Sequence, residues 1–164
     1  MCRQSSRHMD FQERCPLTPP ELSSPAALLS ALTQALHGVF RHLDARRYDA
    51  VLTCFTPDAR WLRQGKWLHG RQAIGAALQE RASDVETCHV MSNAFVIACD
   101  VRTATLEAYM TAYRYPCAGE GEGVPVIAGP LRVNHVITVF ERQEGADWLI
   151  AEQRLLPLVA FQDT

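Results

Sequence analysis

Asp44 and His89 are residue types that can together remove a proton from a carbon atom without a cofactor. Asp44 ends an apolar helical stretch, and His89 opens a stretch that alternates as a β-strand does. Histidine is the commonest general base in enzymes, and a carboxylate beside it orients the ring. Each residue also has a plain structural interpretation, Asp44 as a solvated helix end and His89 as an ordinary strand residue. Catalysis therefore requires that the two side chains meet in one cavity.

Two further side chains are candidates for substrate binding. Trp61 offers a large aromatic surface, and Asn93 lies four residues after His89, on the same face of a strand without a bulge. A tryptophan is more often a core residue, and the Asn93 amide also fits a strand edge. If they share the cavity of Asp44 and His89, they favour a small apolar or aromatic ligand as partner.

Three helices and a series of strands must position these residues. Ser24-Pro25 is a helix start, and apolar residues then recur at steps of three and four up to about Arg46. A second, short helix is predicted over 48–55 and is stopped by Thr56-Pro57. A third helix is predicted over 70–83. Residues 1–24 show no hydrophobic period and form an irregular arm, which leaves 25–164 as the folded domain.

Short extended pieces at 60–63 and 66–68 flank Gln64-Gly65, which is typical of a tight hairpin. Longer strands are predicted over 88–98, 104–115, 131–141 and 148–156. Helices followed by antiparallel strands indicate an α+β fold with helices on one face of the sheet. The late strands are apolar on both faces, so we expect a second copy to bury the outer face in a homodimer.

Composition excludes several classes of function. The chain has 164 residues, 48% of them hydrophobic, which suits one domain, and its net charge of −2 provides no footprint for nucleic acid. Its apolar runs are shorter than the ~20 residues of a membrane span. The six cysteines form no C-x-x-C pair and no apolar signal segment precedes them, so we expect reduced thiols in the cytoplasm. No set of ligands has metal spacing and no nucleotide motif occurs, so we expect neither a metal nor a cofactor.

The order of several motifs resembles the SnoaL-like branch of the nuclear transport factor 2-like superfamily over residues 25 to about 157. The motifs are Asp44 to Leu52, Phe55 to Trp61, Gly70 to Ile74, His89-x-x-x-Asn93, Val139-Phe-Glu-Arg142 and Trp148-Leu-Ile150. The resemblance implies an α+β cone, a curved antiparallel sheet wrapped around a long helix with an apolar cavity between them. Scytalone dehydratase and hexachlorocyclohexane dehydrochlorinase in this branch use an aspartate and a histidine to abstract a proton, and Asp44 and His89 match them.

Other positions depart from the family pattern. The arginine that this family carries on its last strand corresponds to Arg154. If that strand has no bulge, Gln153 occupies the equivalent position instead. The family often has a tyrosine and an aspartate at cavity positions on the strand before the Phe-Glu-Arg motif, and here these positions correspond to Val136 and Thr138. His135 is then expected to point away from the cavity. The resemblance implies a cofactor-independent lyase or isomerase, similar to a dehydratase or cyclase, acting on a small, mostly apolar cyclic molecule. The alternative is a non-catalytic binding or assembly module, similar to the small subunit of ring-hydroxylating dioxygenases.

Overall fold

The computed structural model describes residues 24–119, 123–142 and 146–161, so nearly all of the predicted arm lies outside the described residues. The elements in chain order are α1 (Pro25–Asp44), α2 (Tyr48–Thr53), β1 (Phe55–Arg63), β2 (Lys66–His69), α3 (Gly70–Gln79), β3 (Val85–Cys99), β4 (Thr103–Pro116), β5 (Arg132–Glu141) and β6 (Leu149–Ala160). None of the helices in these described ranges is both long and apolar enough to cross a membrane.

The long helix α1 supplies much of the core. Ser24 caps it by accepting a hydrogen bond from the Ala27 N–H at 3.2 Å, and Pro25 occupies the first turn, where its missing N–H costs nothing. One stripe of the helix is buried, and it consists of Leu28, Leu32, Leu36, Val39, Phe40 and Leu43. The spacing of three and four residues therefore predicted the buried face correctly.

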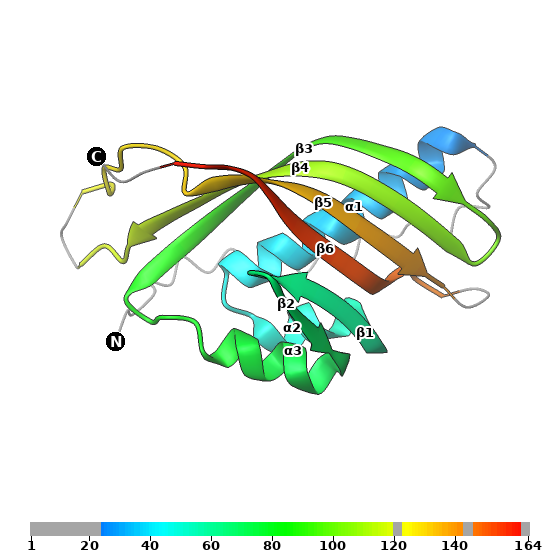
Figure 1. The fold of residues 1–164 in the computed structure, drawn as a ribbon, viewed down its shortest axis with the longest axis horizontal. Coiled ribbons are helices and arrows are strands. Elements are labelled where there is room, and N and C mark those ends of the chain that lie inside the picture. Colours follow the sequence, from blue (N-terminus) through cyan, green and yellow to red (C-terminus); the bar gives the residue numbers. More distant parts are fainter. Residues whose placement is uncertain (1–23, 120–122, 143–145, 162–164) are drawn as a thin grey trace.

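The sheet has the strand order β2-β1-β6-β5-β4-β3 and is mixed rather than wholly antiparallel. The pairs β3–β4, β4–β5 and β5–β6 are antiparallel, but β1 runs parallel to β6. The expected curved sheet around a helix is confirmed, and its antiparallel description is corrected at this one pair. Figure 1 shows α1 beneath the curved β3–β6 sheet, with α2, α3 and the β1–β2 pair together below it.

The boundaries around the first hairpin differ from the prediction. Helix α2 ends at Thr53, and β1 begins at Phe55 and continues through Pro57. Proline is accepted there because the register between β1 and β6 shifts between Phe55 and Arg60, which leaves that stretch without regular pairing. The tight turn is confirmed, since Gln64 and Gly65 both have positive φ values, 53° and 75°.

The cysteines correct one expectation. Cys54, Cys88 and Cys99 are free thiols, whereas Cys117 is disulfide-bonded. The expectation that all six thiols are reduced is therefore wrong. Cys88 and Cys99 are exposed.

Candidate active site

Asp44 is the last residue of α1, and the chain reverses directly after it. Arg46 adopts a left-handed conformation with φ 55°, and the Arg47 N–H donates back to the His42 carbonyl at 2.9 Å. The Arg46 side chain then donates to the Ala82 carbonyl at 2.6 Å and to the Val85 carbonyl. These bonds join the end of α1 to the start of β3, and so they bring Asp44 to His89.

The Asp44 carboxylate and the His89 imidazole form a close pair. Asp44 Oδ1 lies 2.5 Å from His89 Nδ1, and the other carboxylate oxygen accepts the His89 backbone N–H at 2.9 Å. The pair is mostly shielded from water, with 23% of the aspartate side chain and 11% of the histidine side chain exposed. Phe40 packs against the imidazole with its ring centroid at 5.2 Å. Two contacts from one carboxylate fix both the backbone and the ring of His89.

The charge state of Asp44 follows from these contacts. Burial disfavours the charged form, but hydrogen bonds and charge from His89, together with the Thr87 hydroxyl, outweigh it and hold the pKa of Asp44 below its ordinary value. An ionised carboxylate only accepts hydrogen bonds, so the proton in this contact belongs to His89 Nδ1. The neutral ring then carries its lone pair on Nε2, which is the form a general base requires.

Thr87 and Arg81 support the carboxylate from behind. The Thr87 hydroxyl donates to Asp44 Oδ1 at 2.8 Å, and one Arg81 nitrogen donates to that hydroxyl at 2.6 Å. A second Arg81 nitrogen donates to the Leu43 carbonyl at 2.8 Å. Because the arginine reaches Asp44 through Thr87, it positions the carboxylate without competing with the imidazole for it.

His89 opens onto a cavity of about 330 Å³ between α1, α3 and the inner face of the sheet. One part of the wall is apolar, and its larger side chains are Phe40, Leu43, Trp61, Met110, Leu131 and Leu155. Another part is charged and comprises Arg46, Arg63, Arg81, Arg114, Arg132 and Glu80. The expectation of a mostly apolar cavity therefore holds for only part of the wall.

The structure brings Trp61 into this cavity but not Asn93 or Arg154. Trp61 is fully buried and lines the wall. Asn93 is exposed, has φ 53° and lies where the β3–β4 register shifts, so the expected position beside His89 is wrong. Arg154 is paired with Glu152 at 2.5 Å and lies outside the cavity wall, while Gln153 between them is buried and donates to Thr138.

The charged residues of the cavity were missed by the sequence interpretation, although alternation offered a signal for some of them. Arg63 follows Trp61 by two residues, and Arg132 precedes the buried Asn134 by two, so each pair shares one face of its strand. Arg46 and Arg81 gave no such signal, because they come from a helix reversal and a loop that only the fold brings together.

A second histidine and carboxylate pair lies on the outer face of the sheet. His135 Nε2 is 3.3 Å from Glu107 Oε2, and Tyr109 packs near the imidazole with ring centroids 5.9 Å apart. His135 does not line the cavity, as expected from the sequence. The described residues thus include two pairs of similar chemistry, of which the Asp44–His89 pair faces the cavity.

Among the described residues, no group of three or more His, Cys, Asp or Glu side chains is arranged to hold a metal ion. The aspartate and histidine at the site are committed to each other.

Comparison with known proteins places the chain in a family. The model of the SnoaL-like domain matches residues 26–154. The chain belongs to the SnoaL-like family. A search of curated proteins finds no match. Solved structures share the fold at low sequence identity, so they bear on the architecture alone.

One similar structure is a Novosphingobium aromaticivorans protein provisionally named a scytalone dehydratase, with 16% identity, a TM-score of 0.69 and coverage of 85% of this chain and 89% of that one. Another is a Catenulispora acidiphila protein in complex with S-DNPA, with 20% identity, a TM-score of 0.67 and coverage of 80% and 94%. A third is a protein of Novosphingobium aromaticivorans described as nuclear transport factor 2-like with a cystatin-like fold, with 18% identity, a TM-score of 0.63 and coverage of 84% and 92%. The SnoaL-like chain therefore has the α+β cone predicted from its motifs.

Proposed function

We propose that this SnoaL-like protein is a cofactor-independent lyase or isomerase in which His89 is the general base and Asp44 orients it. The substrate is a small cyclic molecule with a C–H bond next to an activating carbonyl group. A cavity of about 330 Å³ is near the lower end of the range for small-molecule sites, which suits one or two fused rings.

In the proposed reaction His89 Nε2 takes the proton, and the electron pair of the C–H bond moves toward the carbonyl oxygen to give an enolate. The resulting imidazolium is stabilised by the Asp44 carboxylate, which lies 2.5 Å from Nδ1. An isomerase returns the proton to a different carbon of the same molecule. A lyase instead releases a leaving group such as hydroxide from the adjacent carbon, and the imidazolium proton leaves with it as water.

The observation that carries this proposal is the contrast between the two histidine and carboxylate pairs. Only 11% of the His89 side chain is exposed and its ring lines the cavity, whereas His135 lies on the outer face with 28% exposed. Exclusion of water strengthens the interaction of the carboxylate with a developing positive charge on the ring. The name of the provisional scytalone dehydratase agrees with elimination chemistry in this fold.

The test is hydrogen exchange catalysed by the protein in D2O. A panel of cyclic ketones with one or two rings is incubated with the purified protein, and uptake of deuterium is measured by mass spectrometry. Exchange requires only the first proton transfer, so it detects the base even when the natural substrate is absent from the panel. His89→Gln and Asp44→Asn should each reduce the rate of exchange by ~10²-fold or more.

His135→Gln is the matched control, because it makes the same substitution in the other pair and should leave exchange unchanged. The double variant of Asp44 and His89 should lose little more than either single variant, because both disable one unit. Exchange that survives in His89→Gln would rule out this base.

A second candidate function is a non-catalytic assembly module, favoured by the apolar outer face of the sheet. Val90, Phe95 and Ile97 are 49%, 62% and 49% exposed on β3. We assign this face instead to a homodimer, the commonest symmetric assembly, because a surface of this kind is normally covered. The cytoplasmic location remains a prediction, and it no longer rests on six reduced thiols.

A further inference from the structure

The cavity wall carries a positive charge that the composition of the chain does not explain. Five arginines line it, Arg46, Arg63, Arg81, Arg114 and Arg132, against Glu80 as the acidic member. The whole chain has 18 acidic and 16 basic residues. The positive residues are thus gathered at the site within a protein of net negative charge.

Two of these arginines have structural roles. Arg46 donates to backbone carbonyls at the start of β3, and Arg81 donates to the Leu43 carbonyl and the Thr87 hydroxyl. Their guanidinium groups hold the end of α1 in place and have several acceptors. They need no ligand to account for their position.

Arg63 and Arg132 differ from them. Both are half-buried in the wall, and within the described ranges neither has a carboxylate within 4.0 Å or a side-chain hydrogen bond. Arg63 stacks over the Trp61 ring, with its guanidinium carbon 5.7 Å from the ring centroid. Burial lowers the pKa of Arg63, and the nearby charges of Arg81 and Arg132 lower it further.

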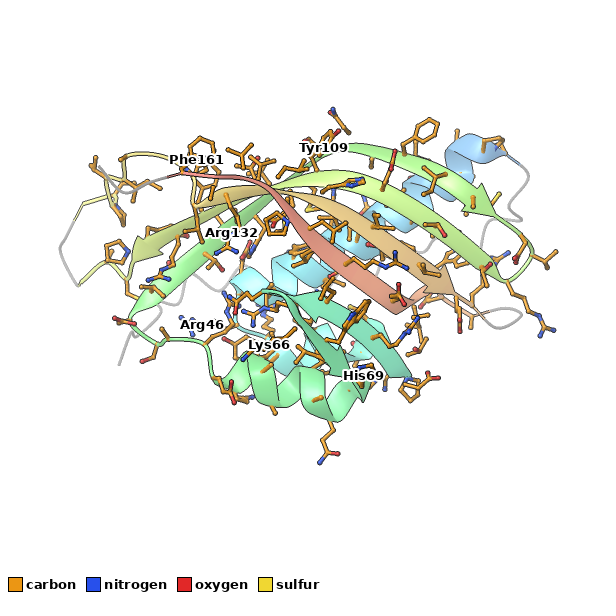
Figure 2. The ribbon with its side chains drawn as sticks, in the orientation of Figure 1. Arg46, Lys66, His69, Tyr109, Arg132 and Phe161 are labelled. Atoms are coloured by element: carbon orange, nitrogen blue, oxygen red, sulfur yellow. The ribbon has the colours of Figure 1, made fainter. Side chains whose placement is uncertain are left out.

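A guanidinium group stays charged in proteins, so these positive charges repel one another in a partly dehydrated space. Partly buried charges are normally paired. An anion between Arg63 and Arg132 would relieve this repulsion. Arg132 and Arg46 both line the cavity, and in Figure 2 they are labelled at the same end of the molecule.

We propose that Arg63 and Arg132 form a subsite for an oxyanion, so that the substrate is a cyclic carboxylic acid held by its carboxylate while His89 faces its ring. This inference rests on the proposed function. The planar fork of arginine matches the two oxygens of a carboxylate, and the apolar residues Phe40 and Met110 face the same cavity.

Two residues beside the arginines carry buried N–H groups. Trp61 Nε1 and Asn134 Nδ2 are buried and have no hydrogen-bond partner among the described residues. Trp61 lies two residues before Arg63 on β1, and Asn134 lies two residues after Arg132 on β5. Both residues line the cavity. These two N–H groups are not exposed to the cavity, so the guanidinium groups of Arg63 and Arg132 supply the donors for an anion.

The test compares ligands that differ only in charge. Dissociation constants for 2-naphthoate, its neutral amide and 2-naphthyl phosphate are measured by NMR titration at low ionic strength, where surface screening is weak. The carboxylate should bind at least ~10-fold more tightly than the amide, as expected for one charged hydrogen-bonding contact. Arg63→Gln and Arg132→Gln should each remove most of that preference. Circular dichroism checks that each variant remains folded.

Arg41→Gln is the control, because Arg41 is exposed on α1 and outside the cavity wall, and it makes the same change of charge. The preference should be unchanged in this variant. Tighter binding of the phosphate ester that needs both arginines supports the oxyanion subsite and identifies phosphate as its group. Equal binding of carboxylate and amide, no binding at millimolar concentration, or a preference that survives in both cavity variants overturns the proposal.

The same titration in His89→Gln separates this inference from the proposed function. Carboxylate preference is a property of binding and should persist when the base is removed. If both proposals are correct, His89→Gln should lose deuterium exchange and keep the preference for the carboxylate over the amide. Preference without any exchange in the wild type would leave the subsite standing and reject the base.

Discussion

Replacing Asp44 by asparagine removes a charge that organises the end of α1. The carboxylate accepts three hydrogen bonds, from the Thr87 hydroxyl, the His89 N–H and the His89 ring. Bonds to a charged group contribute about 1.5–3 kcal/mol each, and the asparagine oxygen can keep some of them at neutral strength. Its NH2 group then faces a donor on His89. We therefore expect Asp44→Asn to lower the free energy of unfolding by about 2–4 kcal/mol at pH 7.

The dependence of this loss on pH has a definite sign. The pKa of Asp44 in the folded protein lies below its ordinary value of 3.8, so the folded state favours the ionised carboxylate. That stabilisation is complete above the unfolded-state pKa and is lost as pH falls through the folded-state pKa. The difference between wild type and Asp44→Asn should persist at pH 5 and shrink below about pH 4.

The assay is urea unfolding followed by tryptophan fluorescence, since Trp61 and Trp148 are buried in the folded protein. The control is Asp58→Asn, because Asp58 is exposed on β1 and its loss should change stability by less than about 0.5 kcal/mol. If Asp44→Asn is as stable as the wild type at pH 7, the carboxylate does not hold the site. A difference that is unchanged at pH 3.5 would refute the role of its ionisation.

Two further predictions concern support of the base and assembly. Thr87→Val removes the hydroxyl between Arg81 and Asp44, so turnover should fall by about tenfold or more, as for loss of one hydrogen bond to a charged group, and steady-state kinetics with unchanged turnover would count against this role. Phe95→Asp places a charge on the exposed outer face, so sedimentation should show a dimer in the wild type and a monomer in the variant at micromolar concentration. A wild-type monomer would contradict the dimer.

The parts of the fold that depend on local pattern could be predicted from the sequence. The spacing in α1 and the Ser24-Pro25 start gave its buried face and its first residue. The pairing of β1 with β6 joins segments far apart in the chain, and no local pattern marks its parallel direction. The meeting of Asp44 and His89 also depends on long-range packing. Their positions at a helix end and a strand start made it a hypothesis, and the resemblance to a family strengthened it. Val136 and Thr138, which the family resemblance placed in the cavity, are fully buried and do not line it. The positions of Arg63 and Arg132 were accessible through alternation from Trp61 on β1 and from the buried Asn134 on β5.

The error at Asn93 and the proposed dimer have one structural cause. Alternation from His89 through Met91 would continue to Asn93 and Phe95 on the inner face, but the register of β3 shifts after Ser92. The left-handed conformation of Asn93 accommodates the extra residue, and asparagine is among the few residues that tolerate it.

Beyond the bulge the faces are exchanged. Ala94 and Val96 pack against the core, while Phe95 and Ile97 become exposed on the outer face. A regular strand would have placed the large apolar residues inside, where they would compete with α1 for the same space. The bulge that withdraws Asn93 from the cavity therefore also exposes Phe95, which has the highest exposed fraction of the exposed aromatic residues, and so one change of register accounts both for the absence of Asn93 from the site and for the proposed dimer contact.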